Sequence, residues 1–201
     1  LPDSIFTPEI PLNCVEEEFR KGVASSFEDR QVINGRSANY TGTELKEGRS
    51  SCQFRNRCIR GCPFGGYFSS NAVTLPAANR TGNMTLRANS IVHEVIYDEK
   101  SKKATGVRVI DAETKESYVF FADIIFLCAS TVPTTSILMM SKSKRFPNGM
   151  GNDSGELGHN MMDHHFKVGA TADYEGHEED YFKGRKPIGF FAPRFRNIAK
   201  S

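Results

Sequence analysis

Apolar residues recur at every fourth position near the start of the chain. They are Val15, Phe19, Val23 and Phe27. Positions four apart lie one above the other on a helix, so these side chains would form one apolar face. Asn13 precedes the run and Glu16 stands three residues later, which is the spacing of a capping box. The pattern predicts an amphipathic helix over about 14–28.

Between residues 85 and 122 the pattern becomes typical of strands. Three stretches rich in Val, Ile, Tyr and Phe are separated by polar turns at 99–103 and 112–116. β-branched and aromatic residues favour strands, and short polar turns join antiparallel neighbours. The sequence therefore predicts a small three-stranded antiparallel meander.

An unbroken apolar run, "DIIFLCA", follows at 123–129. Such a run is typical of a strand that is buried on both faces, as in a parallel sheet. Ser130 or Thr131 can then cap a helix with Pro133 in its first turn. A helix N-terminus beyond a buried strand is a frequent ligand site, because its free N–H groups and dipole face outward. An ordinary strand–helix unit without a ligand explains the same pattern.

The other elements are predicted less directly. Strands are expected at 31–33, 166–173 and 188–196, and a helix is expected to begin at Ser69 or Ser70 and end near Gly82. The Gly- and Asn-rich stretch 145–165 is predicted to be a loop that leads into a short helix. On that helix His159 and Asp163 would share a face. We expect hydrogen bonds at the helix end there rather than a metal site.

Residues 36–68 show little periodicity but hold three of the five cysteines, Cys52, Cys58 and Cys62. Thiolates bind soft metals and iron–sulfur clusters. Three other interpretations are open. The thiols are reduced and structural, two of them form a disulfide, or the three bind zinc together with a histidine that is distant in sequence.

Composition narrows the range of functions. The chain has 201 residues, 38% of them hydrophobic, which is enough for one domain or two small ones. The net charge is only +2 and there is no long basic run, so no nucleic-acid partner is expected. No apolar stretch approaches the 18 residues or so of a transmembrane helix, so no membrane span is expected.

Three stretches, in this order, resemble the glucose–methanol–choline (GMC) oxidoreductases. They are 85–116, 124–141 and 146–165, within a resemblance that covers roughly 60–170. The likeness is nearest to catalytic subunits of bacterial FAD-dependent sugar dehydrogenases. It implies an α/β FAD-binding fold with a substrate domain in the whole protein, and an α+β fold in this part of it. It also implies three segments: 1–82 on the substrate side with the Cys-rich loop, 83–165 as part of the FAD-binding domain, and 166–201 as the start of the substrate-binding domain.

The resemblance implies an enzyme that oxidises a CH–OH group of a sugar or another alcohol. Hydride passes to FAD while a histidine base takes the hydroxyl proton. The resemblance implies that Val92 contacts the adenine through its backbone. It places the turn of Cys128, Ala129 and Ser130 alongside the dinucleotide, and Asp163 and His164 near the flavin.

Two parts of the family pattern are missing from this sequence. There is no G-x-G-x-x-G phosphate loop, since the glycines of 61–66 and 149–155 have the wrong spacing or context. The catalytic histidine pair of the family would follow residue 201. We therefore expect a middle segment of a longer enzyme, with no catalytic residue of its own and with weak FAD binding when alone.

The resemblance also gives the cysteines a role. Cys52, Cys58 and Cys62 resemble the ligands of a 3Fe–4S cluster that passes electrons from the flavin to an outside acceptor, such as an electron-acceptor subunit. That would make the whole protein a dehydrogenase rather than an oxidase. The alternative from another class is a non-enzymatic α+β module for binding or for iron–sulfur electron transfer.

Overall fold

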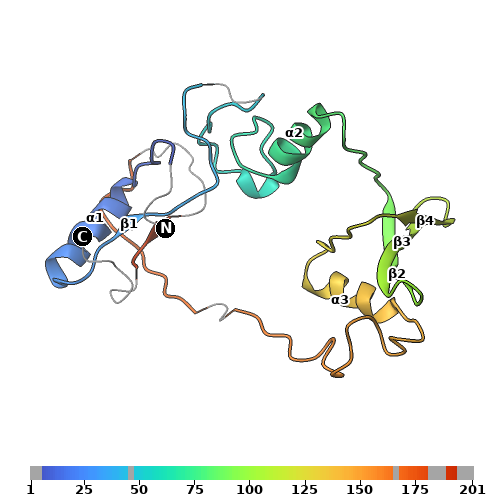
Figure 1. Cartoon of the computed structure of the whole chain (residues 1–201). Helices are drawn as coiled ribbons and strands as arrows, with labels where there is room; N and C mark the ends of the chain where they lie inside the picture. Colours follow the sequence, from blue (N-terminus) through green and yellow to red (C-terminus); the bar gives the residue numbers. More distant parts are fainter. Residues whose placement is uncertain (1–5, 45–47, 165–167, 181–188, 194–201) are drawn as a thin grey trace. The chain divides into compact units, whose positions relative to one another are not determined.

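The computed structural model describes residues 6–44, 48–164, 168–180 and 189–193 (Figure 1). The chain divides into two compact units. One comprises Leu1–Thr85 with Ala170–Ser201, and the other comprises Leu86–Gly169. The three-segment division expected from the sequence stays a prediction.

The predicted first helix is confirmed as α1, Cys14–Ser26. Its capping box is complete: the Asn13 side chain accepts a hydrogen bond from the Glu16 N–H at 2.8 Å, and the Glu16 carboxylate accepts one from the Asn13 N–H at 2.8 Å. The apolar face meets the far end of the chain, because the rings of Phe19 and Phe190 stack with centroids 4.9 Å apart.

Replacing Asn13 by alanine is expected to destabilise this unit by about 1 kcal/mol, because the Glu16 N–H loses its side-chain acceptor. Urea unfolding of the whole protein, followed by a probe in this unit, measures the change. Asn13→Ser keeps an acceptor and serves as the control. Equal destabilisation by serine and alanine would show that the cap contributes nothing.

The rest of this unit has little regular structure. β1 (Ile33–Asn34) pairs antiparallel with β5 (Phe190–Phe191). The 3-10 helix η1 covers Cys58–Arg60, and a π-helical turn, η2 (Ser70–Thr74), leads into α2 (Leu75–Arg80). Ser69 caps η2, at one of the two positions predicted for the helix start, since its hydroxyl accepts from the Ala72 N–H at 3.2 Å. The strand expected at 166–173 is wrong for 168–173, where the chain has no strand, and 166–167 lie outside the described residues.

The second unit contains the predicted meander. The strands are β2 (Ser90–Asp98), β3 (Lys103–Asp111) and β4 (Ser117–Phe121), antiparallel in the order β2-β3-β4. Val95 and Val109, 5% and 3% exposed, form its buried centre. Helix α3 (Thr131–Met140) packs against β2. The described chain is thus α+β, as expected.

A buried serine joins α3 to the sheet. Ser141 follows α3 directly and is 2% exposed. Its hydroxyl accepts from the Val95 N–H at 2.8 Å and donates to the Ile137 carbonyl at 2.6 Å. Since a buried N–H must find an acceptor, this contact fixes the end of α3 against β2.

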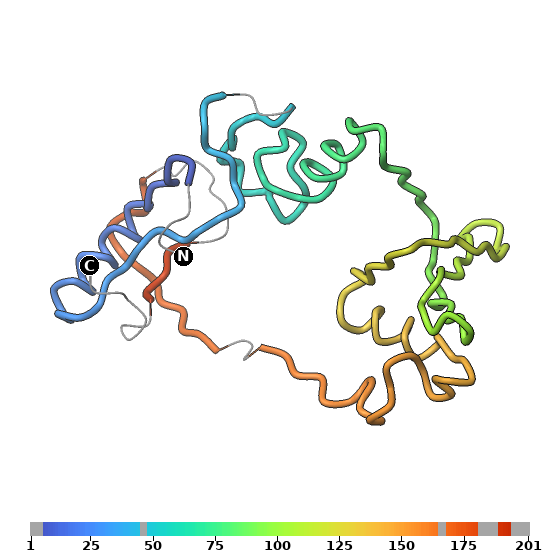
Figure 2. The backbone as a smooth tube through the Cα atoms, in the orientation of Figure 1, coloured from blue at the N-terminus to red at the C-terminus, as the bar shows by residue number. Residues whose placement is uncertain are grey.

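The strand predicted at 123–129 is wrong for this structure. The segment runs extended from β4 to α3 (Figure 2) but pairs with no strand in the described part of the chain. Ile124 is 71% exposed and Phe126 is 82% exposed. The physical reason is that an extended segment becomes a strand only where a neighbour takes up its N–H and C=O groups. We call residues 123–129 the apolar ribbon.

The short helix expected near the end of 145–165 is also absent from its described residues, 145–164. Four glycines here have positive φ, a backbone state that interrupts a helix. They are Gly149, Gly151, Gly155 and Gly158. His159 and Asp163 therefore do not share a helix face. Within the described ranges, no helix combines the length and the apolarity needed to cross a bilayer.

Candidate functional site

A hollow of about 510 Å³ opens between the start of β2 and the end of the apolar ribbon. Val92 lines it from β2, and Cys128 and Ala129 line it from the ribbon, with Pro133 from α3 beside them. Three of the residues expected to contact a dinucleotide thus lie on one surface. They come from the first strand of the meander and from the segment that follows its last strand.

The hollow has polar backbone edges on otherwise apolar walls. β2 is an outer strand of the sheet, so one of its edges has no strand neighbour in the described chain. No described acceptor receives a hydrogen bond from the N–H groups of Phe126, Leu127 or Ala129. A flat aromatic ligand with hydrogen-bonding edges suits such a surface, because apolar walls with a few placed polar groups are typical of cofactor sites.

The turn that leaves this hollow is strained. Ser130 has φ +71° and ψ 171°, a conformation that is favourable almost only for glycine and costs about 1–3 kcal/mol for other residues. Its side chain makes no capping hydrogen bond to α3, so the predicted serine cap is wrong for Ser130. Its carbonyl instead accepts from the Thr134 N–H at 3.0 Å. Ser130 is exposed and does not line the hollow, although its neighbour Ala129 does.

Asp163 and His164 lie apart from this lining. Both are exposed, and the Asp163 carboxylate accepts a hydrogen bond from the His164 N–H at 2.7 Å. They follow directly after a second, larger hollow of about 930 Å³ between α3 and residues 158–162. Met139, Met161 and Met162 give this hollow apolar walls. This hollow could not be predicted from the sequence, because no repeating pattern relates the residues of α3 to residues 158–162.

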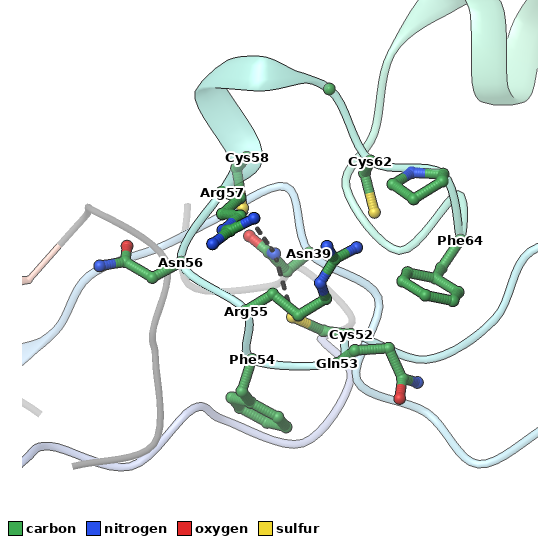
Figure 3. A pocket seen from close by; sticks show the side chains of 12 residues that line it. Asn39, Cys52, Gln53, Phe54, Arg55, Asn56, Arg57, Cys58, Cys62 and Phe64 are labelled. Carbon is green, nitrogen blue, oxygen red and sulfur yellow. Dashed lines mark hydrogen bonds between the residues drawn. The ribbon is translucent and has the colours of Figure 1, made fainter.

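The three cysteines of the long loop face one another around a small space (Figure 3). Cys52, Cys58 and Cys62 line a hollow of about 30 Å³, roughly the room of one water molecule. All five cysteines of the chain are free, so no disulfide is present.

Asn39 lies beside two of these cysteines and was not predicted from the sequence. Its side chain amide donates toward Cys52 Sγ at 3.4 Å and toward Cys58 Sγ at 3.9 Å (Figure 3). The residue is 8% exposed, and its Oδ1 has no partner among the described residues. No motif relates Asn39 to the cysteines, because the contact depends on how the loop closes.

The third cysteine is surrounded by backbone donors. Burial alone raises the pKa of the Cys62 thiol, but the N–H groups of Tyr67, Phe64 and Gly66 outweigh it and lower that pKa, with the charge of Arg55 adding to the effect. The loop therefore favours a thiolate at Cys62. The thiolate is the form that binds metal.

A single zinc ion does not fit the loop cysteines as they stand. Tetrahedral zinc with Zn–S bonds of about 2.3 Å brings its sulfurs to about 3.8 Å from one another. The sulfurs of Cys52, Cys58 and Cys62 do not all lie within 4.8 Å of one another. Among the described residues, only Cys14, His177 and Asp180 form a set of three potential ligands that close. An iron–sulfur cluster spreads its ligands over several metal atoms, so wider sulfur spacing suits it better.

Comparison with known proteins connects the chain to one family. The sequence profile described as GMC oxidoreductase matches residues 19–166. A 2-methyl-1,2-propanediol dehydrogenase from Mycolicibacterium austroafricanum is 30% identical over 145 residues, which are 72% of this chain and 26% of that protein. The fructose dehydrogenase large subunit of Gluconobacter japonicus is 27% identical over 118 residues, 59% of this chain and 21% of the relative.

A third relative is an uncharacterized GMC-type oxidoreductase from Sinorhizobium fredii, which is 28% identical over 110 residues. That match covers 54% of this chain and 22% of the relative. The chain thus spans about a quarter of the length of the curated relatives that it matches.

Proposed function

The chain belongs to the GMC oxidoreductase family, and we propose that it supplies part of the FAD-binding domain of an enzyme that oxidises a CH–OH group of an alcohol or a sugar. The profile match over 19–166 and the two relatives named as dehydrogenases support an enzyme rather than a non-enzymatic module. One of these names refers to a diol and the other to a sugar, so the substrate class proposed here covers both.

The observation that carries the proposal is the shared surface of Val92, Cys128 and Ala129. Each was expected beside the dinucleotide on resemblance alone, and all three line the 510 Å³ hollow. Bound FAD would supply the hydride-accepting chemistry. The residues of this chain would bind it through backbone N–H and C=O groups and keep water away with the apolar walls.

The remaining roles of this chain are proposals on the same basis. Asp163 and His164 would lie toward the flavin end, next to the larger hollow at α3. Residues 1–82 and 166–201 would belong to the substrate side. The base that takes the substrate's hydroxyl proton would be a histidine outside these 201 residues.

Filling the 510 Å³ hollow tests the FAD assignment. Ala129→Leu adds a branched side chain where the cofactor would lie, and we expect FAD affinity to fall by about tenfold or more, a loss of about 1.4 kcal/mol for each factor of ten. Flavin absorbance per protein after dialysis, and titration of the apoprotein with FAD, measure the loss.

Ala122→Leu is the matched control for this experiment. Ala122 is exposed, follows β4 and does not line the hollow, so the same substitution there should leave FAD affinity unchanged. Full FAD binding by Ala129→Leu, with the control behaving as expected, would contradict the proposal.

We further propose that Cys52, Cys58 and Cys62 hold a 3Fe–4S cluster in the whole protein. Support comes from the donor set: three convergent thiols, the Asn39 amide directed at two of them, and backbone N–H groups at the third. Hydrogen bonds to the sulfurs are among the factors that set a cluster's reduction potential. The present space of about 30 Å³ is too small for a cluster, so the loop must open to admit one.

Such a cluster would carry one electron at a time toward an acceptor outside the flavin site. A partner subunit that accepts electrons is part of this proposal. The fructose dehydrogenase relative is named as a large subunit, which supports a multi-subunit enzyme.

A further inference from the structure

We propose that Cys14, His177 and Asp180 bind one divalent transition-metal ion, with zinc the best match to their donor atoms. Their ligand atoms all lie within 4.8 Å of one another. All three residues belong to the unit formed by Leu1–Thr85 and Ala170–Ser201. The site shares no residue with the three-cysteine loop or with the hollow at β2, and it does not depend on the proposed oxidoreductase function.

Local structure holds each ligand in place. Cys14 is the first residue of α1, directly after the Asn13 cap, so the capping box fixes its backbone. His177 and Asp180 stand at the two ends of one turn, closed by the Asp180 N–H to the His177 carbonyl at 3.2 Å. The imidazole also stacks on the ring of Tyr174, with centroids 5.7 Å apart.

The distances suit a tetrahedral ion with one open position. Bonds of about 2.3 Å to sulfur and 2.0–2.2 Å to nitrogen and oxygen place such ligands about 3.3–3.8 Å apart. His177 Nδ1 and Asp180 Oδ2 are now 2.6 Å apart in a hydrogen bond, so these two atoms need to separate slightly when an ion binds. That hydrogen bond keeps both side chains at the site before metal enters.

The donor types and the exposure also favour a transition metal. Thiolate, imidazole and carboxylate are the three ligand classes of protein zinc sites, whereas calcium and magnesium prefer oxygen alone. The side chains of His177 and Asp180 are 26% and 58% exposed, which leaves an entry path and room for a water ligand. Glu18 lies one helical turn from Cys14, but it hydrogen-bonds Lys21 at 2.7 Å and we do not count it as a ligand.

A bound ion would tie α1 to the turn 177–180, two segments that are far apart in sequence. Closing so long a loop with a metal stabilises the folded state, because the unfolded chain does not hold the ligands together. The proposed role of the ion is therefore structural: it would cross-link α1 and the turn 177–180 within this unit.

The test uses the whole protein with Cys52, Cys58 and Cys62 replaced by serine, so that the loop cannot bind metal. Stripped of metal, titrated with zinc and dialysed, it is expected to retain about one zinc ion per chain by elemental analysis. In this background Cys14→Ser and His177→Gln should each weaken zinc affinity at least tenfold. Cobalt serves as the spectroscopic probe, and its thiolate charge-transfer band should disappear with Cys14→Ser.

Cys128→Ser and His159→Gln are the matched controls, since both residues lie outside the site. Circular dichroism of each variant shows whether it is folded, and its flavin content reports separately on the FAD assignment. Retention of far less than one zinc ion, or equal loss with Cys14→Ser and Cys128→Ser, would overturn the proposal.

Discussion

Replacing Ser141 by alanine is expected to lower the stability of the unit Leu86–Gly169 by about 1–3 kcal/mol, the cost of a buried donor left without a partner. The hydroxyl makes two hydrogen bonds, but they do not matter equally. The Ile137 carbonyl still accepts from the Ser141 backbone N–H at 3.0 Å after the change. The Val95 N–H, in contrast, loses its acceptor in a place that is 5% exposed.

Hydrogen–deuterium exchange of the whole protein measures this effect where it arises. Peptides that cover β2 and α3 should exchange faster in Ser141→Ala by about a factor of 5 to 150, the rate equivalent of that free energy. Ser117→Ala is the control, because Ser117 is exposed at the start of β4 and its side chain makes no hydrogen bond to a described residue. Unchanged exchange in β2 would mean that water or another group replaces the serine.

The second large effect is expected at the cysteine loop. Replacing Cys52, Cys58 and Cys62 together by serine should remove the iron and acid-labile sulfide from anaerobically purified whole protein. FAD content should stay unchanged, since the loop and the hollow at β2 share no residue. Reduction of an outside acceptor should fall far more than reduction of the flavin by substrate, because a cluster acts after the flavin.

Two further variants make this test specific. Cys14→Ser with Cys128→Ser removes the two cysteines outside the loop and should leave the iron in place. Asn39→Leu keeps the thiols but removes the amide that points at Cys52 and Cys58. We expect it to retain a cluster with a lower midpoint potential, since N–H donors to sulfur favour the reduced state. Iron-free wild-type protein from anaerobic purification would contradict the cluster proposal.

Local patterns were enough to predict helix α1 and the three-stranded meander. Helix α1 follows from a four-residue apolar repeat and a capping box, both of which act within a few residues. The meander follows from strands joined by short polar turns. The apolar ribbon was predicted wrongly because its local pattern is right for a strand, but strand formation depends on neighbours that the described chain does not provide.

The candidate sites, like the apolar ribbon, depend on residues that are far apart in sequence, and local patterns did not reveal them. Val92, Cys128 and Ala129 were predicted together only through a family resemblance, since nothing in their own sequence indicates that they share a surface. Asn39 and the pair His177 and Asp180 were not predicted. Each lies near its cysteine only because the folded chain brings together positions that are far apart in sequence, where periodicity carries no information.

The exposed ribbon between β4 and α3 also has a bearing on how the protein is produced. A bare extended stretch with Ile124 and Phe126 largely in solvent is a template for pairing with an identical stretch on another copy. While the polypeptide is being synthesised, that stretch needs either rapid coverage or chaperone protection. These 201 residues produced by themselves should therefore aggregate. Replacing Phe126 by a charged residue should reduce that aggregation.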